Sequence, residues 1–439
     1  MNMNNKIIKI GVIGIGTVGS ALINHLKSNK KVIQDISGYR FEVTSVCAKS
    51  KLKKRNCNIS NIKFFSNPLK LVESPHVDIV VELIGGTKLA FDIFKAANKL
   101  HKPLVTANKA LIALKGNQID KILSKKYSPV FFEASVAGGI PIIKVMKESL
   151  AGNKIQYIAG IINGTTNYIL TEMGLYNKKF NDTLKKAQEL GYAESDPTFD
   201  VGGIDAAHKL TILASLAFGF PLSFKNVYIE GIEKITPEDH NYASQLGYNI
   251  KHLAICKKTQ KGVQLRVHPC FVPSTRLIAN VNGVMNAIVV SSIPAGKTLY
   301  YGPGAGGSAT ASSVLSDIID AGKYLNTSNV DKFSITNHIN INSNLNLVDI
   351  ADIKSSYYLR LRVINKAGVL AKITKLLGSK SISIESIIQK EEKFPDNTVP
   401  LVIETHEVEE KNLLNAIKSI ERIKEVKNKV VKIRIEKLS

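Results

Sequence analysis

The stretch GGIDAAHKLTILA, residues 202–214, has the apolar content of a buried helix and yet carries a carboxylate and an amine. Asp205 and Lys209 are four residues apart, so in a helix they share one face about a turn from each other. Such a pair is usually solvent-exposed and adds roughly a few tenths of a kcal/mol. A catalytic pair would instead have the lysine supply a proton and the carboxylate orient a substrate. Spacing alone favours the exposed ion pair, so the rest of the chain must decide.

A second group of residues suited to chemistry lies near the start of the chain. The stretch IIKIGVIGIGTVGSALINHL reads as strand, turn and helix, with Gly14, Gly16 and Gly19 in the order G-x-G-x-x-G. In this context the glycines allow a tight turn, a close approach of the backbone to a pyrophosphate, and close packing of helix on strand. The pyrophosphate would lie at the helix N-terminus, near Thr17 and Val18. The segment therefore predicts a dinucleotide-binding site.

The cofactor's adenosine ribose is expected to lie at the end of the next strand, FEVTSVCAKS. NAD-preferring sites usually have Asp or Glu there, whereas this chain has Lys49, followed by the basic run KLKKR at 51–55. This composition favours a 2′-phosphate and hence NADP(H), with NAD(H) as the alternative. The same lysines would also suit a plain exposed loop.

Further strands are predicted at VDIVVELIGG, KPLVTAN and SPVFFEAS, with the helical run LAFDIFKAANKL between the first two. Alternating strands and helices predict an α/β fold with a Rossmann-type, doubly wound parallel sheet over residues 1–137. A chain of 439 residues is long enough for two or three domains.

Composition narrows the class of protein. The net charge of +23 raises the question of nucleic acid, but the lysines are scattered and have no interleaved aromatic residues, so no nucleic-acid partner is expected. The four cysteines lack metal-type spacing, which indicates free thiols. No leader peptide or membrane span is recognisable, so we expect a cytoplasmic protein without a membrane partner.

Several motifs of the middle segment occur together: GIINGTTNYIL, AQELGYAESDPTFDVGGIDAAHKLTILA and YYGPGAGGSATASSVLSDI. With VELIGGT and LVTANKALIA, they resemble homoserine dehydrogenase from about residue 7 to about residue 325. The resemblance implies NAD(P)H-dependent, reversible reduction of L-aspartate 4-semialdehyde to L-homoserine, in threonine and methionine biosynthesis. It also implies an α+β catalytic and oligomerisation domain over 138–318, and a homo-oligomer, either a dimer or a tetramer.

The resemblance also implies roles for individual residues. Lys209 would be the proton donor and acceptor at the reacting oxygen, which suits a lysine because that oxygen gains negative charge during reduction. Asp205 would bind the substrate's hydroxyl end, and Lys109 of TANKA would lie where nicotinamide and substrate meet. Glu194 and the backbone of Gly191, in GYAESDP, would bind the amino-acid end.

Two later segments are implied to meet the cofactor. They contain Thr87 of VELIGGT and Gly306 of YGPGAGG. In the family the chain returns to the first domain here, so residues of about 303–330 should complete the cofactor-binding domain.

The stretch FFEASVAGGIP resembles the family's monovalent-cation site. Glu133 and the main-chain oxygens of Val136, Gly138 and Ile140 would surround sodium or potassium, since hard oxygen ligands suit such an ion. The alternative is a plain glycine turn after a strand.

The C-terminal segment has a different pattern. Residues 355–436 read as strand, helix, strand, strand, helix, strand, which is the ferredoxin-like layout. The stretch LRVINKAGVLAKIT resembles the opening of an ACT domain, and such domains usually bind a small amino acid near the loop before the first helix. Here Asn365 replaces the usual aspartate of that loop, so we expect threonine as a weak effector. We further expect removal of this domain to leave an active enzyme.

The chain opens directly on the first strand, so a monofunctional enzyme is expected. Two other classes of function deserve comparison. Aldehyde oxidation through a thioester needs a reactive thiol, and the cysteines lie away from the glycine and glutamate motifs. An amino-acid or nucleotide sensor on a dehydrogenase scaffold is the other class, since fold alone does not fix function. Loss of Lys209 or Glu194 would favour the sensor, and both residues are present.

Overall fold

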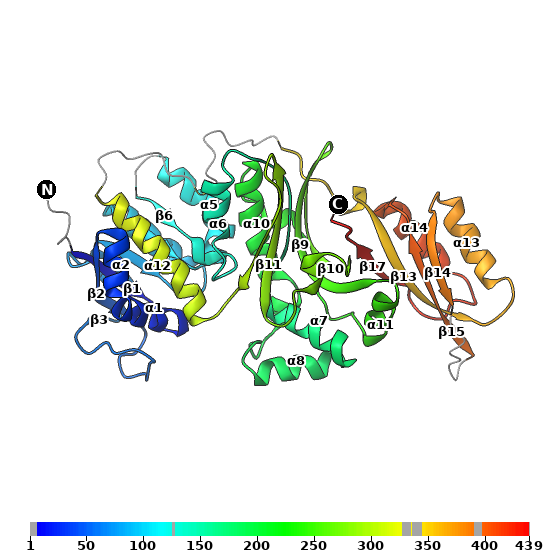
Figure 1. Cartoon of the computed structure of the whole chain (residues 1–439), viewed down its shortest axis with the longest axis horizontal. Helices are drawn as coiled ribbons and strands as arrows, with labels where there is room; N and C mark the ends of the chain where they lie inside the picture. Colours follow the sequence, from blue (N-terminus) through cyan, green and yellow to red (C-terminus); the bar gives the residue numbers. More distant parts are fainter. Residues whose placement is uncertain (1–6, 125–127, 327–334, 336–344, 390–396, 439) are drawn as a thin grey trace. The chain divides into compact units, whose positions relative to one another are not determined.

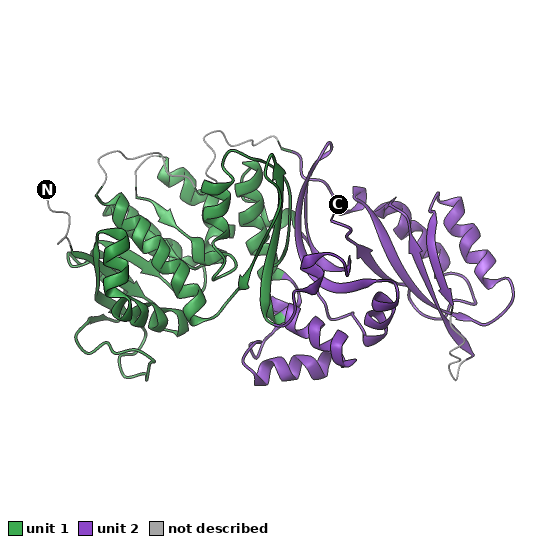
Figure 2. Ribbon diagram, viewed as in Figure 1, with its two compact units in different colours: residues 1–165, 204–227, 284–345 green, residues 166–203, 228–283, 346–439 purple. Residues whose placement is uncertain are grey.

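The computed structural model describes residues 7–124, 128–326, 335, 345–389 and 397–438. The chain forms two compact units, each assembled from three stretches of sequence (Figure 2). Unit 1 comprises residues 1–165, 204–227 and 284–345, and unit 2 comprises residues 166–203, 228–283 and 346–439. Each unit therefore combines segments that are far apart in the sequence.

Among its described residues, unit 1 contains a six-stranded parallel sheet in the order β3-β2-β1-β4-β5-β6 (Figure 1). The strand order reverses between β1 and β4, as in doubly wound dinucleotide-binding sheets. The predicted Rossmann-type sheet is thus confirmed. Its strands are β1 (Ile7–Ile13), β2 (Arg40–Cys47), β3 (Lys63–Phe65), β4 (Ile79–Glu82), β5 (Leu104–Thr106) and β6 (Val130–Phe131).

Helices cover this sheet because their apolar residues recur at helical spacing. Helix α1 (Thr17–Ser28), for example, buries Leu22, Ile23 and Leu26. Strand β1 is buried almost throughout, as expected for a parallel strand covered on both faces. The other helices of this part are α2 (Lys30–Ser37), α3 (Pro68–Glu73), α4 (Lys88–Lys99), α5 (Lys109–Leu123) and the 3-10 turn η2 (Glu133–Ser135).

A late segment of the chain returns to this sheet. Helix α12 (Gly307–Tyr324) lies against α1 (Figure 1). Its Val314 and Ile318 share a buried core with Ile10 of β1 and Leu22 of α1. The hydrophobic core of the first domain is therefore completed from the far end of unit 1.

The rest of unit 1 is a second layer of helices and antiparallel strands. Strand β11 (Met285–Ile293) pairs with β7 (Lys154–Ile161) on one side and with β12 (Gly296–Pro303) on the other. Helix α10 (Ile204–Phe218) contacts both α5 and β7. The shorter elements are α6 (Ile142–Lys144), the π-helix η3 (Val145–Ser149) and η4 (Phe224–Asn226), and α7 (Gly164–Tyr176) begins in unit 1.

Unit 2 contains the ferredoxin-like C-terminal layout that the sequence predicted. Strands β13 (Lys354–Ile364), β14 (Ile384–Gln389), β15 (Thr398–Thr405) and β17 (Val431–Ile435) form a sheet in the order β17-β13-β15-β14. Helices α13 (Val369–Ser379) and α14 (Glu410–Ile420) pack on it around a buried core that includes Leu359, Ile373 and Leu413. The predicted ACT-type architecture is therefore confirmed.

This sheet continues into the strands of the middle segment. Strand β17 pairs in parallel with β10 (Gly262–Pro273), which forms an antiparallel hairpin with β9 (Tyr248–Thr259). The remaining elements of unit 2 are α8 (Phe180–Glu189), α9 (Thr198–Val201), β8 (Tyr228–Ile229), α11 (Pro237–Gln245), η5 (Leu277–Asn280), η6 (Ile350–Asp352) and β16 (Val408–Glu409). The C-terminal layout is thus joined edge to edge with the middle strands.

All four cysteines are free thiols, as predicted. In the described ranges, no helix combines the length and the apolar character needed to cross a membrane.

The glycine turn yields a stability prediction. A Cβ atom on Gly19 would lie 2.1 Å from the main-chain oxygen of Gly14, so Gly19→Ala must push α1 away from the turn. We expect it to lower the free energy of unfolding by about 1–3 kcal/mol, the usual cost of overpacking. Gly16→Ala is the matched control, because no atom lies within 4 Å of its Cβ position. Urea unfolding measures the free energy of unfolding of both variants. Equal decreases in Gly19→Ala and Gly16→Ala would contradict the prediction.

Candidate active site

The structure brings the three predicted catalytic residues together in unit 1. Asp205 lies in the first turn of α10 and is only 2% exposed. Its Oδ2 accepts a hydrogen bond from Lys209 Nζ at 2.7 Å, and its Oδ1 lies 2.6 Å from Lys109 Nζ. Lys209 Nζ also donates to the main-chain oxygen of Ile162 at 2.8 Å. The carboxylate therefore lies between two ammonium groups, in a buried position that excludes an exposed ion pair.

Electrostatics keep Asp205 ionised. Burial by itself would raise its pKa, but the charges and hydrogen bonds of Lys209 and Lys109 outweigh burial and hold the pKa well below its usual range. A further donor is the side chain of Asn163, whose Nδ2 lies 2.9 Å from Asp205 Oδ2. The site thus contains a fixed negative charge with three donors around it.

His208, the neighbour of Lys209 in sequence, has a different environment. Its ring lies against Phe224, with the ring centroids 4.4 Å apart. Burial lowers its pKa to about 4, so it is neutral near pH 7. This packing agrees with the absence of His208 from the predicted site.

The start of α5, where Lys109 lies, is fixed by a buried hydrogen-bond network. Asn108 caps the helix by accepting from the backbone of Leu111, and its Nδ2 donates to the main-chain oxygens of residues 84 and 86. The backbone N–H of Asn108 donates to Thr106 Oγ1 at 3.0 Å, and Thr106 Oγ1 donates to Glu82 Oε2 at 2.6 Å. Glu82 and Thr106 end β4 and β5, so the sheet edge itself positions Lys109.

The sequence interpretation did not single out four of these polar residues. They are Glu82, Thr106, Asn108 and Asn163, although the motifs VELIGGT, LVTANKALIA and GIINGTTNYIL contain them. The sequence did contain a signal for two of them. Glu82 and Thr106 are polar residues at the ends of two predicted parallel strands, and ligands bind at this edge of such sheets.

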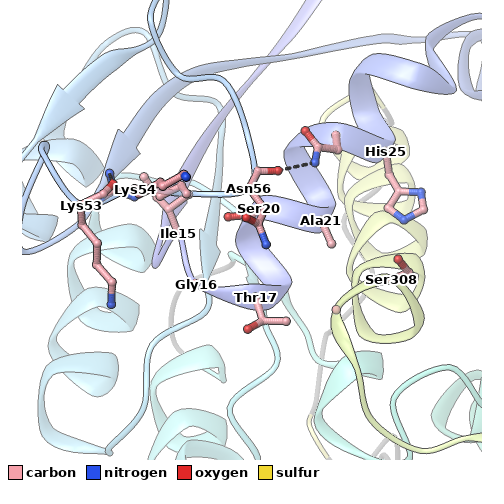
Figure 3. Close-up of a pocket in the computed structure, with 13 residues that line it drawn as sticks. Ile15, Gly16, Thr17, Ser20, Ala21, His25, Lys53, Lys54, Asn56 and Ser308 are labelled. Carbon is pink, nitrogen blue, oxygen red and sulfur yellow. Dashed lines mark hydrogen bonds between the residues drawn. The ribbon is translucent and has the colours of Figure 1, made fainter. Parts of the chain in front are cut away.

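A pocket of about 530 Å³ lies at the glycine turn of unit 1. Figure 3 shows Gly16 and Thr17 between Lys53 and Lys54 on one side and Ser308 on the other. The pocket is lined by residues 15–17, 20, 21, 24 and 25 around α1, by 53–56 of the basic loop, and by 307 and 308 at the start of α12. A backbone turn at a helix N-terminus together with cations is the composition of a dinucleotide-phosphate site.

The predicted cofactor residues divide into those that line this pocket and those that do not. Gly16 and Thr17 line it, whereas Val18 packs against the apolar core and Gly19 is buried beneath the turn. Gly14 has φ of +100° and hydrogen-bonds through its N–H to the main-chain oxygen of residue 47, which shapes the turn. Outside the pocket lining are Lys49, Thr87, Lys109 and Gly306.

The basic loop is held in a defined shape. The guanidinium of Arg55 donates to the main-chain oxygens of Ser50, Lys51 and Lys53, and Asn24 of α1 donates to the main-chain oxygen of Asn56 at 2.7 Å. These bonds bring residues 53–56 to the pocket, and they leave Lys49 exposed outside its lining.

The predicted substrate residues Glu194 and Gly191 belong to unit 2. Both are exposed on the segment between α8 and α9, where Gly191 has φ of +74°. The main-chain oxygen of Glu194 accepts from Gln188 Nε2 at 3.1 Å. Their geometry is that of an accessible turn, and their role stays a prediction.

The predicted cation loop has a sharply curled backbone. Ala137 and Gly138 have φ of +54° and +43°, and the main-chain oxygen of Gly138 accepts from Ser313 Oγ at 2.6 Å. The carboxylate oxygens of Glu133 accept from the backbone N–H groups of Ile143 and Lys144. Glu133 therefore anchors the turn that comes after it.

The donors of this loop differ from those of a transition-metal site. In the part of the chain that the structure describes, no group of three or more His, Cys, Asp or Glu side chains could hold a metal. The donors on offer are mainly carbonyl oxygens, including those of Val136 and Ile140, and such donors fit a monovalent cation.

A doubly wound sheet with a phosphate-type pocket at its glycine turn, and a buried Asp205–Lys209 pair in the same unit, is the arrangement expected of an NAD(P)-dependent oxidoreductase. Comparison with known proteins gives the family. Models of homoserine dehydrogenase match residues 141–319, those of its NAD-binding domain match 14–133, and those of the ACT domain match 357–422. The chain belongs to the homoserine dehydrogenase family.

Individual relatives agree over the whole chain. The homoserine dehydrogenase of Pseudomonas aeruginosa is 46% identical over 438 residues, which is 99% of this chain and 100% of the relative. A crystal structure of homoserine dehydrogenase from Thiobacillus denitrificans aligns with a TM-score of 0.93 at 43% identity, over 99% of both chains. A hyperthermophilic archaeal homoserine dehydrogenase in complex with NADPH aligns with a TM-score of 0.63 at 29% identity, over 74% of this chain and 100% of that one.

Glu82 yields a prediction about pH. Burial raises its pKa from 4.5 to about 7, against the hydrogen bonds of Thr106, Ile84 and Asn108, which lower it. Ionisation of the buried carboxyl group therefore lowers the free energy of unfolding as the pH rises from about 4.5 to about 7. Below about pH 4.5 the group is protonated in both states and this loss is absent. Glu82→Gln should gain about 1–3 kcal/mol of unfolding free energy relative to the wild type between pH 5 and pH 8. A difference that stays constant over this range, measured by denaturant unfolding, would contradict a buried neutral Glu82.

Proposed function

We propose that this chain catalyses the reversible, NAD(P)H-dependent reduction of L-aspartate 4-semialdehyde to L-homoserine, with Lys209 as proton donor and acceptor. The observation that carries the proposal is the buried Asp205 carboxylate with Lys209 and Lys109 on its two oxygens. A buried charge cluster of this kind is costly to maintain, and sites that carry one are often functional.

The ammonium group of Lys209 and the carboxylate of Asp205 suit the reduction of an aldehyde. A bound nicotinamide would supply the hydride to the aldehyde carbon in the reductive direction. As the carbonyl oxygen gains negative charge, an ammonium group held nearby stabilises it and then transfers a proton, which completes the alcohol. Asp205 orients Lys209 together with the main-chain oxygen of Ile162, and it binds the substrate's hydroxyl end. In the oxidative direction the same lysine accepts the proton.

The remaining substrate contacts are proposed from the family motif. Glu194 binds the substrate's ammonium group, and the backbone of Gly191 contributes at the same amino-acid end. Their exposure on the turn after α8 is consistent with a ligand that arrives from solvent.

NADP(H) is the proposed cofactor, with NAD(H) as a poorer alternative. The basic residues Lys53, Lys54 and Arg55 line the pocket at the glycine turn, and cations there suit a 2′-phosphate. The archaeal relative whose structure contains NADPH supports this choice. Lys109, Thr87 and Gly306 are assigned to the nicotinamide side of the cofactor.

A monovalent cation, sodium or potassium, is proposed for the loop after η2. Glu133 and the main-chain oxygens of Val136, Gly138 and Ile140 would hold it. Such an ion would neutralise the carbonyl dipoles that the curled backbone gathers, and so stabilise the loop.

The C-terminal domain is proposed as a regulatory site for a small amino acid. A pocket of about 250 Å³ lies within it, lined by residues 363–370, 389 and 401. Threonine, a distal product of the pathway proposed here, is the expected effector. The enzyme is further proposed to act in threonine and methionine biosynthesis, as a cytoplasmic homo-oligomer.

The first test replaces the proposed acid. Lys209→Ala should lower kcat by about 10² to 10⁴ while the Kd for NADP changes little, because the lost charge acts at the reacting oxygen and not at the phosphates. Steady-state oxidation of homoserine and a cofactor titration measure the two effects. Lys121→Ala, on the exposed side of α5, is the control. Retention of near wild-type kcat by Lys209→Ala would contradict the proposal.

The second test separates two pairs of lysines in the basic loop. The double variant Lys53→Ala with Lys54→Ala should raise the KM for NADP about tenfold or more and change that for NAD less, because these residues line the pocket. The pair Lys49→Ala with Lys51→Ala removes the same charge outside the lining and should have a smaller effect. The assignment fails if NADP and NAD respond equally, or if the two pairs are equivalent.

The third test concerns threonine. Asn365 occupies the position where ACT domains usually have an aspartate, so the charge partner of a ligand's ammonium group is missing. We expect half-inhibition of the full chain only at millimolar threonine, roughly −4 kcal/mol of binding. Asn365→Asp should lower the inhibitory concentration about tenfold. Sub-micromolar inhibition of the unmodified chain, or no gain in the variant, would show this reasoning wrong.

A further inference from the structure

The C-terminal domain supplies a buried arginine to the middle part of unit 2. Arg434, on β17, has a side chain that is 1% exposed. Its guanidinium forms hydrogen bonds to both carboxylate oxygens of Glu410 and donates to Glu230 Oε2 at 2.9 Å. It also lies over the ring of Tyr228, whose hydroxyl donates to the same Glu230 oxygen at 2.9 Å. A buried arginine thus joins the last strand of the chain to the segment at 228–230.

That segment is in turn connected to the residues just before α10. The main-chain oxygen of Glu230 lies 2.9 Å from His252 Nε2, and because a carbonyl oxygen can only accept, the ring donates this bond. Burial lowers the pKa of His252 to about 4, so the ring is neutral near pH 7. The ring packs against Gly203, where a Cβ would lie 3.1 Å from His252 Cε1 and 3.1 Å from Ile229 Cγ2. The backbone of Ile232 also donates to the main-chain oxygen of Val201 at 3.0 Å. Residues 229–232 therefore hold the turn at 201–203 from two sides.

The turn at 201–203 matters because it leads directly into α10. Gly203 has φ of +86°, a left-handed conformation that favours glycine. The next residue, Ile204, begins α10, and Asp205 is the second residue of that helix. A single peptide bond joins the turn to α10, so a change in the backbone at Gly203 is passed along the chain to Ile204 and Asp205.

We infer that Glu230 is a positioning residue for the catalytic helix, held by Arg434 of the C-terminal domain and acting through His252 and Gly203. The inference rests on the proposed function of Asp205 and Lys209. It adds a role that the sequence motifs do not contain: the C-terminal domain supports catalysis indirectly, through the turn before α10, in addition to the regulatory pocket proposed above.

The same contacts revise the expectation that the C-terminal domain can be removed without loss of activity. Ile433 and Ile435 of β17 share a buried core with Ile232 and Phe271 of the middle segment. Removal of β17 would uncover the edge of β10 and would leave Glu230 without its arginine.

The chain offers a matched control for Glu230. Arg360, on β13, also comes from the C-terminal domain and pairs with Glu238 at 2.6 Å and with Asp239 at 2.8 Å, both on α11. The side chains of Glu230 and Glu238 are 29% and 30% exposed. Each arginine would keep a buried carboxylate partner if its more exposed glutamate were replaced. Of the two glutamates, Glu230 is the one whose main chain contacts the ring that packs on Gly203.

The experiment compares Glu230→Ala with Glu238→Ala in the full chain. For Glu230→Ala we expect kcat for homoserine oxidation to fall about tenfold with the KM for NADP within about twofold, because misplacement of catalytic groups affects the chemical step. Backbone amides of residues 201–209 should exchange with deuterium faster in this variant, with similar thermal stability in both. Glu230→Gln, which keeps an acceptor for Arg434 and Tyr228, should recover part of kcat. Glu238→Ala should stay within about twofold of the unmodified chain in kcat.

Three results would overturn the inference: equal losses of kcat in the two alanine variants, unchanged exchange at 201–209 in Glu230→Ala, or faster exchange there with unchanged kcat. The exchange measurement does not depend on the chemical role of Lys209. A failure of the proposed function, seen as an active Lys209→Ala variant, is therefore distinguishable from a failure of this inference.

Discussion

The centre of unit 1 depends on one buried carboxylate and the two ammonium groups that neutralise it. Burial of an unpaired carboxylate costs several kcal/mol, so Asp205 can stay ionised only where both lysines reach it. Lys209 reaches it from the same helix, whereas Lys109 comes from the start of α5. The charged cluster therefore forms only when α5 packs against α10, because this packing brings Lys109 to Asp205.

The edge of the parallel sheet explains why this cluster and the cofactor pocket belong to one unit. The glycine turn comes directly after β1, and the network that fixes the start of α5 uses Glu82 and Thr106, which end β4 and β5. The carboxyl ends of parallel strands meet at one edge, and the strand order reverses between β1 and β4 at the same place. Lys109 thus begins a helix at the edge where a dinucleotide is expected.

Local patterns made the fold and the Asp205–Lys209 pair predictable, because a strand-turn-helix motif and a four-residue spacing involve near neighbours in sequence. The third member of the cluster, Lys109, could be inferred only from family motifs, since no periodicity links α5 to α10. The sequence indicated the basic loop but not its shape: residues 53–56 line the pocket and Lys49 does not, and the role of Lys49 at the cofactor stays a prediction. The parallel pairing of β17 with β10 joins segments far apart in sequence and left no local signal.

This pairing limits how the C-terminal domain can influence catalysis. Arg360 joins it to the middle segment through the buried Asp239, and Arg434 joins it through Glu230, whose side chain is 29% exposed. Breaking the buried Arg360–Asp239 pair costs several kcal/mol because a charge is left unpaired. A hinge between β10 and β17 would have to break these pairs and also separate a shared apolar core. The proposed ligand of the pocket at residues 363–370 would therefore have to favour an arrangement in which these pairs persist. Glu230 connects the paired strands β10 and β17 to the turn at 201–203 through His252, so this turn is the part of the middle segment on which such a ligand would act.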